Sequence, residues 1–169
     1  LAALAVGPTR AVAGGRDGSV FVLQLQDKTV AKLAAFPHPG DPVLSVAVSP
    51  DESLAAAGTQ GGKVRLCRLA DGSESSLDAH TGGTTGVSFR RDGTLLATGG
   101  KDRSVKVWQR AGATFELLFV VADLPSPVLS VEFSRADDKL LVLLMNEYAV
   151  RVWDVGTVRT HLSGLKLGW

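Results

Sequence analysis

The chain has 169 residues, of which 45% are hydrophobic, so its length suits about one domain with a packed core. Its 18 Lys and Arg residues nearly balance its 17 Asp and Glu residues, and the net charge of +1 provides no cationic field to attract nucleic acid or an anionic membrane. The single cysteine, Cys67, excludes an internal disulfide and a multi-cysteine metal site. No run of about eighteen apolar residues indicates a transmembrane helix.

A repeat of about 41–45 residues runs through the whole sequence. Two independent landmarks show the same period. The valines that open four similar runs are Val20, Val64, Val105 and Val150, at steps of 44, 41 and 45 residues. The apolar triplets that precede them begin at Leu4, Val46, Val87 and Val131, at steps of 42, 41 and 44 residues. Because the two landmarks drift together, the repeat predicts four successive structural units.

Each unit shows the alternation of apolar with small or polar residues that is typical of β-strands. Aspartate and glycine between the strands indicate tight turns, because both residues tolerate positive φ. In the first unit the predicted elements are a strand from Leu4, a turn at 16–18, and strands at 19–25 and 29–35. In the second unit they are a strand from Val46, turns at 49–52 and 60–62, and strands at 54–58, 63–69 and 74–77.

The last two units repeat this order. In the third, the predicted elements are a strand from Val87, turns at 90–93 and 101–103, and strands at 95–100, 104–110 and 115–121. In the fourth, they are a strand from Val131, turns at 134–138 and 146–148, and strands at 140–144, 149–155 and 157–162. Four short antiparallel strands per unit predict an all-β propeller. We expect a single partial propeller over 1–169, with blades at about 1–42, 43–83, 84–127 and 128–162 and a C-terminal tail at 163–169.

The third unit resembles a WD-repeat of the β-propeller class, from its histidine through RRDG to LLATGGKDRSVKVW. The resemblance implies a hydrogen-bonded tetrad of His80, Thr98, Asp102 and Trp108. Such a network is physically sensible, because a buried imidazole, hydroxyl, carboxylate and indole N–H each need a partner.

The other units depart from this pattern. The first keeps Asp17, with Ala13 and Leu23 at the hydroxyl and indole positions. The second has Ala57, Gly61 and Cys67 at the three positions, and His38 is one residue out of place. The fourth keeps Trp153, with Leu143 and Glu147 at the hydroxyl and carboxylate positions. We therefore expect partial tetrads at Asp17 and Trp153, and apolar packing in place of the rest.

Four blades in an open row leave two apolar faces without a neighbour. We expect the chain to be part of a ring of seven or eight blades; pairing of two copies or closure of four blades alone are the alternatives. The tail HLSGLKLGW looks like the end of WD-repeat arrays at the C-terminus of large bacterial signalling proteins, including serine/threonine protein kinases.

Catalytic and metal-binding interpretations are weaker. His80, Thr98 and Asp102 could form a triad, but their spacing fits the repeat and favours a structural role. The acidic residues that could bind a metal are Asp51, Asp92, Asp137 and Asp138, all in predicted turns where aspartate is common. No zinc, calcium or kinase motif occurs. We expect no enzyme activity, cofactor or metal in this chain.

The predicted function is a non-catalytic scaffold for protein–protein interaction in a larger multidomain protein of bacterial signalling type. The candidate binding rim consists of Arg16, Asp41, Gln60, Lys101, Arg103, Ser126, Asn146 and Tyr148. Tyr148 is the candidate hot spot, because aromatic anchors dominate many interfaces.

The alternative is a regulatory or substrate-recruiting portion of an enzyme, such as a bacterial serine/threonine protein kinase, whose catalytic domain lies outside this chain. We expect protein or peptide partners, further blades or a second copy, no nucleic acid, no membrane, and a cytoplasmic location. Arg90 and Arg91 lie in the first predicted turn of the third unit and Lys101 and Arg103 in the second, so they form no compact phosphate-binding patch.

Overall fold

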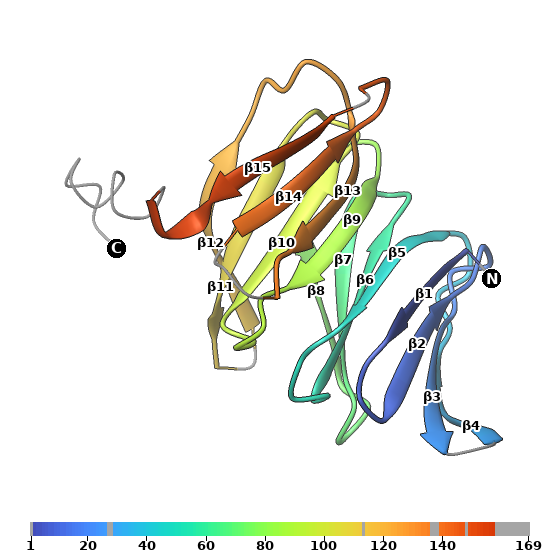
Figure 1. The fold of residues 1–169 in the computed structure, drawn as a ribbon. Helices are drawn as coiled ribbons and strands as arrows, with labels where there is room; N and C mark the ends of the chain where they lie inside the picture. Colours follow the sequence, from blue (N-terminus) through green and yellow to red (C-terminus); the bar gives the residue numbers. More distant parts are fainter. Residues whose placement is uncertain (1, 27–28, 113, 136–138, 148, 158–169) are drawn as a thin grey trace.

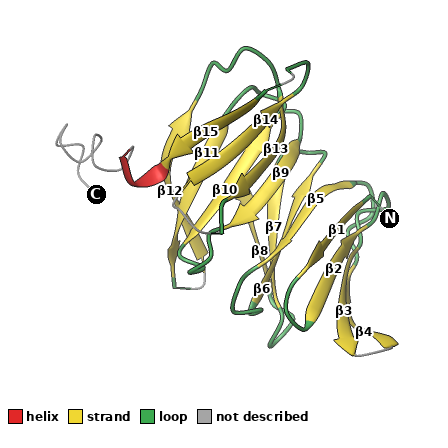
Figure 2. Ribbon diagram, in the orientation of Figure 1, coloured by secondary structure: helices red, strands yellow, loops and turns green. Residues whose placement is uncertain are grey.

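The computed structural model describes residues 2–26, 29–112, 114–135, 139–147 and 149–157. The described residues form fifteen strands in four antiparallel sheets, and in each sheet the strands neighbour one another in sequence order (Figure 1). We name the sheets blades 1 to 4 in chain order. Strands dominate the described chain, as Figure 2 shows, with one short helical turn at 155–157. The prediction of an all-β propeller is confirmed.

The strands predicted for the first two blades lie close to the observed ones, except that the first strand of blade 2 begins three residues before Val46 and that no range was predicted for the second strand of blade 1. Blade 1 consists of β1 (Ala3–Val6), β2 (Arg10–Gly14), β3 (Val20–Gln26) and β4 (Thr29–Phe36). Blade 2 consists of β5 (Val43–Val48), β6 (Leu54–Thr59), β7 (Lys63–Arg68) and β8 (Glu74–Asp78). β6 is the short alanine-rich strand, and it is buried along its whole length between its neighbours.

The last two blades differ in the number of their described strands. Blade 3 consists of β9 (Thr84–Phe89), β10 (Leu95–Gly100), β11 (Val105–Ala111) and β12 (Thr114–Val121). Blade 4 consists of β13 (Val128–Phe133), β14 (Lys139–Leu144) and β15 (Val150–Asp154). The fourth strand predicted for blade 4 at 157–162 begins in the helical turn at 155–157, and the rest of it lies outside the described residues, as does the tail at 163–169.

The hydrophobic core lies in the joints between successive blades. The joint of blades 1 and 2 buries Val12, Val20 and Val22 against Val43 and Cys67. Two further clusters join blades 2 and 3 and blades 3 and 4 in the same way. Each blade therefore depends on its neighbours for burial, which is why the strands are apolar on both faces.

Glycine at the end of the second strand lets the next blade approach closely. A Cβ on Gly14 would lie 2.3 Å from Cγ1 of Val43, and a Cβ on Gly99 would lie 2.4 Å from Cγ1 of Val128. Both distances are too short for real atoms, so the spacing of these joints requires the absence of a side chain.

Blade 4 corrects one assignment made from the sequence. Thr98 pairs with Val87 and Lys106, and the matching residue of blade 4 is Val142, which pairs with Val131 and Arg151. Thr98 and Trp108 are ten residues apart, and counting ten residues back from Trp153 wrongly placed Leu143 at this position. The connection between β14 and β15 is one residue longer than that between β10 and β11, which shifts the count. Leu143 instead occupies the position of Gly99.

Candidate functional site

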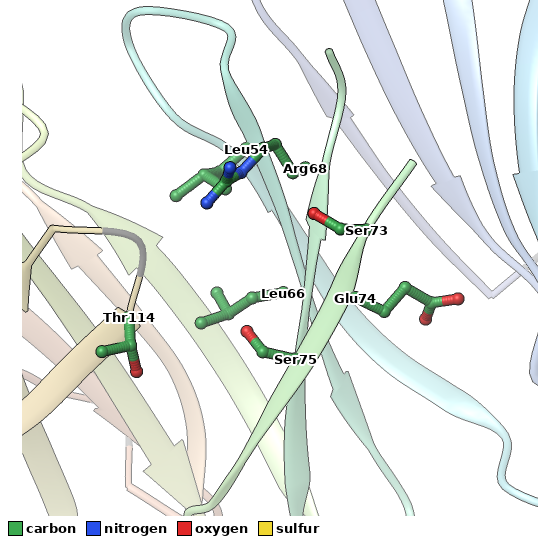
Figure 3. Close-up of a pocket in the computed structure, with 7 residues that line it drawn as sticks. All are labelled: Leu54, Leu66, Arg68, Ser73, Glu74, Ser75 and Thr114. Carbon is green, nitrogen blue, oxygen red and sulfur yellow. The ribbon is translucent and has the colours of Figure 1, made fainter. Parts of the chain in front are cut away.

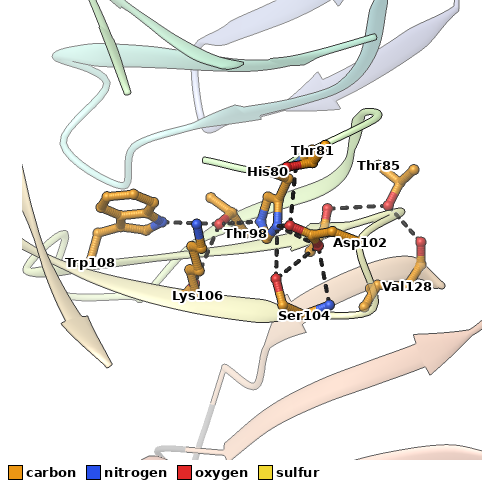
Figure 4. A network of polar contacts seen from close by, with 10 residues as sticks. His80, Thr81, Thr85, Thr98, Asp102, Ser104, Lys106, Trp108 and Val128 are labelled. Atoms are coloured by element: carbon orange, nitrogen blue, oxygen red, sulfur yellow. Dashed lines mark hydrogen bonds and ion pairs between the residues drawn. The ribbon is translucent and has the colours of Figure 1, made fainter. Parts of the chain in front are cut away.

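The tetrad residues of blade 3 come from four successive parts of the chain. His80 lies in the loop before β9, Thr98 on β10, Asp102 in the turn between β10 and β11, and Trp108 on β11 (Figure 4). In a meander, the start of the first strand and the turn between the second and third strands lie at the same end of the sheet. The fold thus brings the histidine to the aspartate.

A continuous chain of hydrogen bonds joins the four side chains. His80 Nδ1 lies 2.9 Å from a carboxylate oxygen of Asp102, and His80 Nε2 lies 2.9 Å from the hydroxyl of Thr98. The indole N–H of Trp108 donates to the same hydroxyl at 3.0 Å. A neutral imidazole that carries its proton on Nδ1 satisfies every group, because Thr98 then donates its hydroxyl proton to Nε2.

Burial and charge set the ionisation of this network. Burial of the His80 side chain, which is 0% exposed, lowers the pKa of the imidazole, although the nearby Asp102 carboxylate favours the protonated form. Burial alone would raise the pKa of Asp102, but hydrogen bonds from Ser104, His80 and the Thr81 N–H hold it below its ordinary value. A neutral imidazole beside a charged carboxylate is therefore the favoured state at neutral pH.

The network has the order of a catalytic triad but lacks access for a substrate. Thr98 is 0% exposed, and its hydroxyl oxygen already accepts the indole N–H of Trp108. A nucleophile must reach a substrate carbonyl, and this hydroxyl faces only protein. The geometry supports a structural role.

Ser104 is a fifth member that the sequence analysis missed. Its hydroxyl lies 3.1 Å from His80 Nδ1 and donates to Asp102 at 2.8 Å. Blade 1 contains the same turn, in which the backbone N–H of Ser19 donates to Asp17 at 3.1 Å. The spacing Asp-x-Ser, present in both turns, was the signal in the sequence.

Among the described residues, the partial tetrads at Asp17 and Trp153 have no chain of hydrogen bonds like that of blade 3. Asp17 is exposed and contacts Ser19, whereas Ala13 at the hydroxyl position is buried. Trp153 is partly buried and packs against the apolar cluster between blades 3 and 4. Glu147 forms an ion pair with Arg151 at 3.1 Å.

Blade 2 contains a different polar network, which the sequence analysis also missed. Arg65 is 4% exposed and donates to the backbone oxygens of Gly18 and Phe36 in blade 1. Its guanidinium also pairs with Glu74 at 2.9 Å, and Glu74 lies 3.3 Å from His38 Nε2. An arginine between the apolar residues Val64 and Leu66 was the signal for this network. It fastens blade 2 to blade 1.

Cys67 lies beside this network as a buried, free thiol. Burial, reinforced by the charge of Glu74, raises the pKa of the thiol to about 12. The reactive thiolate is therefore disfavoured, and the side chain acts as a small apolar group.

The residues of the candidate rim follow the turns between second and third strands and the loops between blades. The exposed ones are Arg16, Gln60, Lys101, Arg103 and Asn146. Asp41 and Ser126 are partly buried and hold loops: the Asp41 carboxylate accepts the N–H of Gly61 at 2.7 Å, and the Ser126 hydroxyl donates to the backbone oxygen of Met145. Tyr148 lies outside the described residues.

The acidic turn residues bind their own turns. Asp51 accepts hydrogen bonds from Ser49 and Ser53, and Asp92 accepts the N–H of Thr94 at 2.9 Å. Asp137 and Asp138 lie outside the described residues. Within the described ranges, no three His, Cys, Asp or Glu residues gather as metal ligands.

The basic residues of blade 3 are divided between the two ends of β10. Arg90 and Arg91 follow β9 at one end, and Lys101 and Arg103 follow β10 at the other. The described part of the chain contains no helix with the length and apolar character needed to span a membrane.

Comparisons with known proteins agree with this geometry. The family model "WD domain, G-beta repeat" matches residues 31–67 and 72–109. WD repeat-containing protein SL1-17 of Schistosoma mansoni is 37% identical over 95 residues, which cover 56% of this chain and 31% of the relative. The target of rapamycin complex subunit wat1 of Schizosaccharomyces pombe is 32% identical over 123 residues, which cover 70% of this chain and 37% of the relative. The chain thus spans about a third of these relatives.

The crystal structure of the RRP9 WD40 repeats superposes with a TM-score of 0.80 at 22% identity. The superposition covers 92% of this chain and 48% of that structure. Four blades stacked through apolar joints, two segments that match the repeat model, and this neighbour lead to one conclusion. The described residues have the fold of a WD40 β-propeller, residues 31–67 and 72–109 match the WD-repeat model, and blade 3 contains the full buried tetrad.

Proposed function

We propose that this chain is a non-catalytic scaffold that binds protein partners through the rim formed by its β2–β3, β6–β7, β10–β11 and β14–β15 turns. The observation that supports the proposal most is the contrast, in blade 3, between exposed charged residues in the turn and the buried tetrad beside it. Lys101 and Arg103 are exposed in the turn next to Asp102, whereas the tetrad beneath them is buried and satisfied. The network fixes the turn, and the exposed residues are free to contact a partner.

The innermost strands offer little chemistry for catalysis. β1, β5, β9 and β13 are described in full, and among their side chains Glu132 is the one that titrates. A hydrolytic or transfer centre needs several converging acid, base or nucleophilic groups. This composition favours a binding function over an enzymatic one.

Membership of a larger signalling protein, with or without a kinase domain, stays a prediction. SL1-17 and wat1 are each about three times as long as the region that aligns with this chain, which is compatible with further blades or domains in a parent protein. A catalytic domain elsewhere in that parent would make this propeller its recruiting segment.

Charge reversal tests the rim. The double variant Lys101→Glu with Arg103→Glu should lose most captured partners in quantitative affinity capture from the source cell. Arg91→Glu, at the opposite end of blade 3, is the matched control and should retain them. Equal capture by both variants would contradict the rim proposal, provided that their thermal midpoints match that of the unmodified chain.

A further inference from the structure

The outermost strand of blade 2 differs from those of blades 1 and 3. The pairing of β4 with β3 and that of β12 with β11 each contain a register shift. The pairing of β8 with β7 runs without interruption from Lys63 and Asp78 to Cys67 and Glu74. Bulges are one way in which proteins prevent an edge strand from pairing with another chain, and β8 lacks this protection.

The backbone of β8 directs alternate groups outward. The carbonyl of Ser73 accepts the N–H of Arg68 at 2.8 Å, which fixes Ser73 as a residue that bonds to β7. In an antiparallel ladder the bonding direction alternates along the strand. The N–H and C=O groups of Glu74, Ser76 and Asp78 therefore point away from β7, where a further strand would bind them.

A groove lies beside this edge, between β8 and the start of β12 (Figure 3). Its volume is about 260 Å³, and the buried side chains of Leu54 and Leu66 form its apolar floor. Ser75 and Thr114 stand on opposite sides of it, and Arg68 lies at one end. Sites for drug-sized ligands are usually about 300–1,000 Å³, so this groove suits an inserted side chain better than a cofactor.

Arg68 places a cation at one end of the groove, and its ion pair there is weak. The guanidinium of Arg68 is 3.5 Å from Asp71, and both side chains are well exposed, so this ion pair contributes little stability. Glu74, by contrast, turns away from the groove (Figure 3) and is held by Arg65 at 2.9 Å. A carboxylate that enters the groove would thus meet a cation.

We propose that β8 and this groove form a second interaction surface, which binds an extended peptide segment of a partner protein as an added strand. An aliphatic side chain opposite Ser75 enters the groove over Leu54 and Leu66. A carboxylate two residues away lies opposite Ser73 and pairs with Arg68. Backbone hydrogen bonds supply affinity and the groove supplies specificity, as in other cases of strand addition. The surface lies on the side of blade 2 and does not depend on the rim.

A synthetic peptide tests the proposal directly. The probe is a fluorescein-labelled TDTLTDT peptide, which places a carboxylate two residues from leucine in either strand direction, titrated against the full chain by fluorescence anisotropy. We expect saturable binding that weakens at least about tenfold when lysine replaces both aspartates or when the alternate backbone amides are N-methylated. The N-methylated peptide removes the backbone bonds without altering the protein.

Variants of two adjacent serines provide the matched pair. Ser75→Phe fills the groove and should weaken binding about tenfold, whereas Ser76→Phe faces blade 1 and should leave it within about twofold. Lys101→Glu on the rim should have no effect, which separates this surface from the rim. Absence of saturable binding, or binding that tolerates both Ser75→Phe and N-methylation, overturns the proposal.

Discussion

The hydroxyl of Thr98 joins two buried groups that have no other route to a partner within the tetrad. It accepts from the Trp108 indole and donates to His80 Nε2, so its removal leaves one donor and one acceptor unmet at once. Unmet buried polar groups cost about 1–3 kcal/mol each, which exceeds the net gain from a typical satisfied bond. A side chain of the same shape without the hydroxyl therefore isolates this contribution.

We expect Thr98→Val or Asp102→Ala to lower the free energy of unfolding by about 1–3 kcal/mol, because each leaves buried partners unsatisfied. Asp17→Ala in blade 1 should cost less, since Asp17 is exposed and bonds only within its own turn to Ser19. Urea denaturation of the variants measures the difference. Equal losses in blades 1 and 3 would show that the network adds nothing beyond the turn.

Stability should also depend on pH through His80. Its folded pKa is lowered by burial, so the unfolded chain binds a proton first as the solution becomes acidic. This contribution is complete above the unfolded pKa of about 6.5 and declines as pH falls through that value toward the folded pKa. We expect a lower urea midpoint at pH 5.5 than at pH 7.5, and a smaller difference in His80→Gln. An unchanged pH dependence in this variant would refute the assignment.

At the scale of the strand and its joint, glycine decides how closely blades pack. Gly99 has no room for a Cβ beside Val128, while Leu143 at the same position of blade 4 lies on the open face, partly buried. Any contact on the open face of blade 4 must therefore differ from the three joints inside the chain. A neighbour packed there must accommodate a leucine side chain.

Gly99→Ala should destabilise the chain by about 1–3 kcal/mol, the usual cost of adding atoms to a well-packed interior. The added methyl would lie 2.4 Å from Val128 Cγ1, so β10 or β13 has to move. Leu143→Ala is the control on the opposite, open face and should change stability far less. Thermal denaturation followed by circular dichroism compares the two; a harmless Gly99→Ala would mean that the joint is loose.

Sequence periodicity was sufficient for the strands but insufficient for two features of the site. The four-strand pattern recurs because every blade has the same apolar faces, so β6 and β10 could be placed from the sequence alone. A turn one residue longer in blade 4 changed the register and moved Leu143 off the Thr98 position. The Arg65 network was missed because its partners come from another blade, and local patterns do not encode contacts between blades.

At the scale of the whole molecule, blades 1 and 4 each have one face without a neighbour among the described residues (Figure 1). Leu4 and Val6 on β1 are 58% and 65% exposed, and Val150 and Val152 on β15 are 53% and 54% exposed. Neighbouring apolar side chains with this exposure form a contiguous apolar surface, and such surfaces favour association with another protein. Covering the open faces of blades 1 and 4 would add the stabilising interfaces that these two blades lack.

The isolated chain should therefore associate rather than remain a monomer at tens of micromolar. Burial of an apolar face contributes about 25 cal/mol per Å², and over a whole blade face this amounts to several kcal/mol, comparable with the stability of a domain. A head-to-tail pair that copied the internal joints would set Leu143 against Leu4, where the internal joint of blades 3 and 4 sets Gly99 against Val131. Two leucines do not fit that spacing, so pairing should give a wider joint and a mixture of species rather than one closed ring of eight blades. Light scattering and sedimentation velocity on the purified chain measure this. A single stable monomer across that concentration range would instead support four blades that close on themselves.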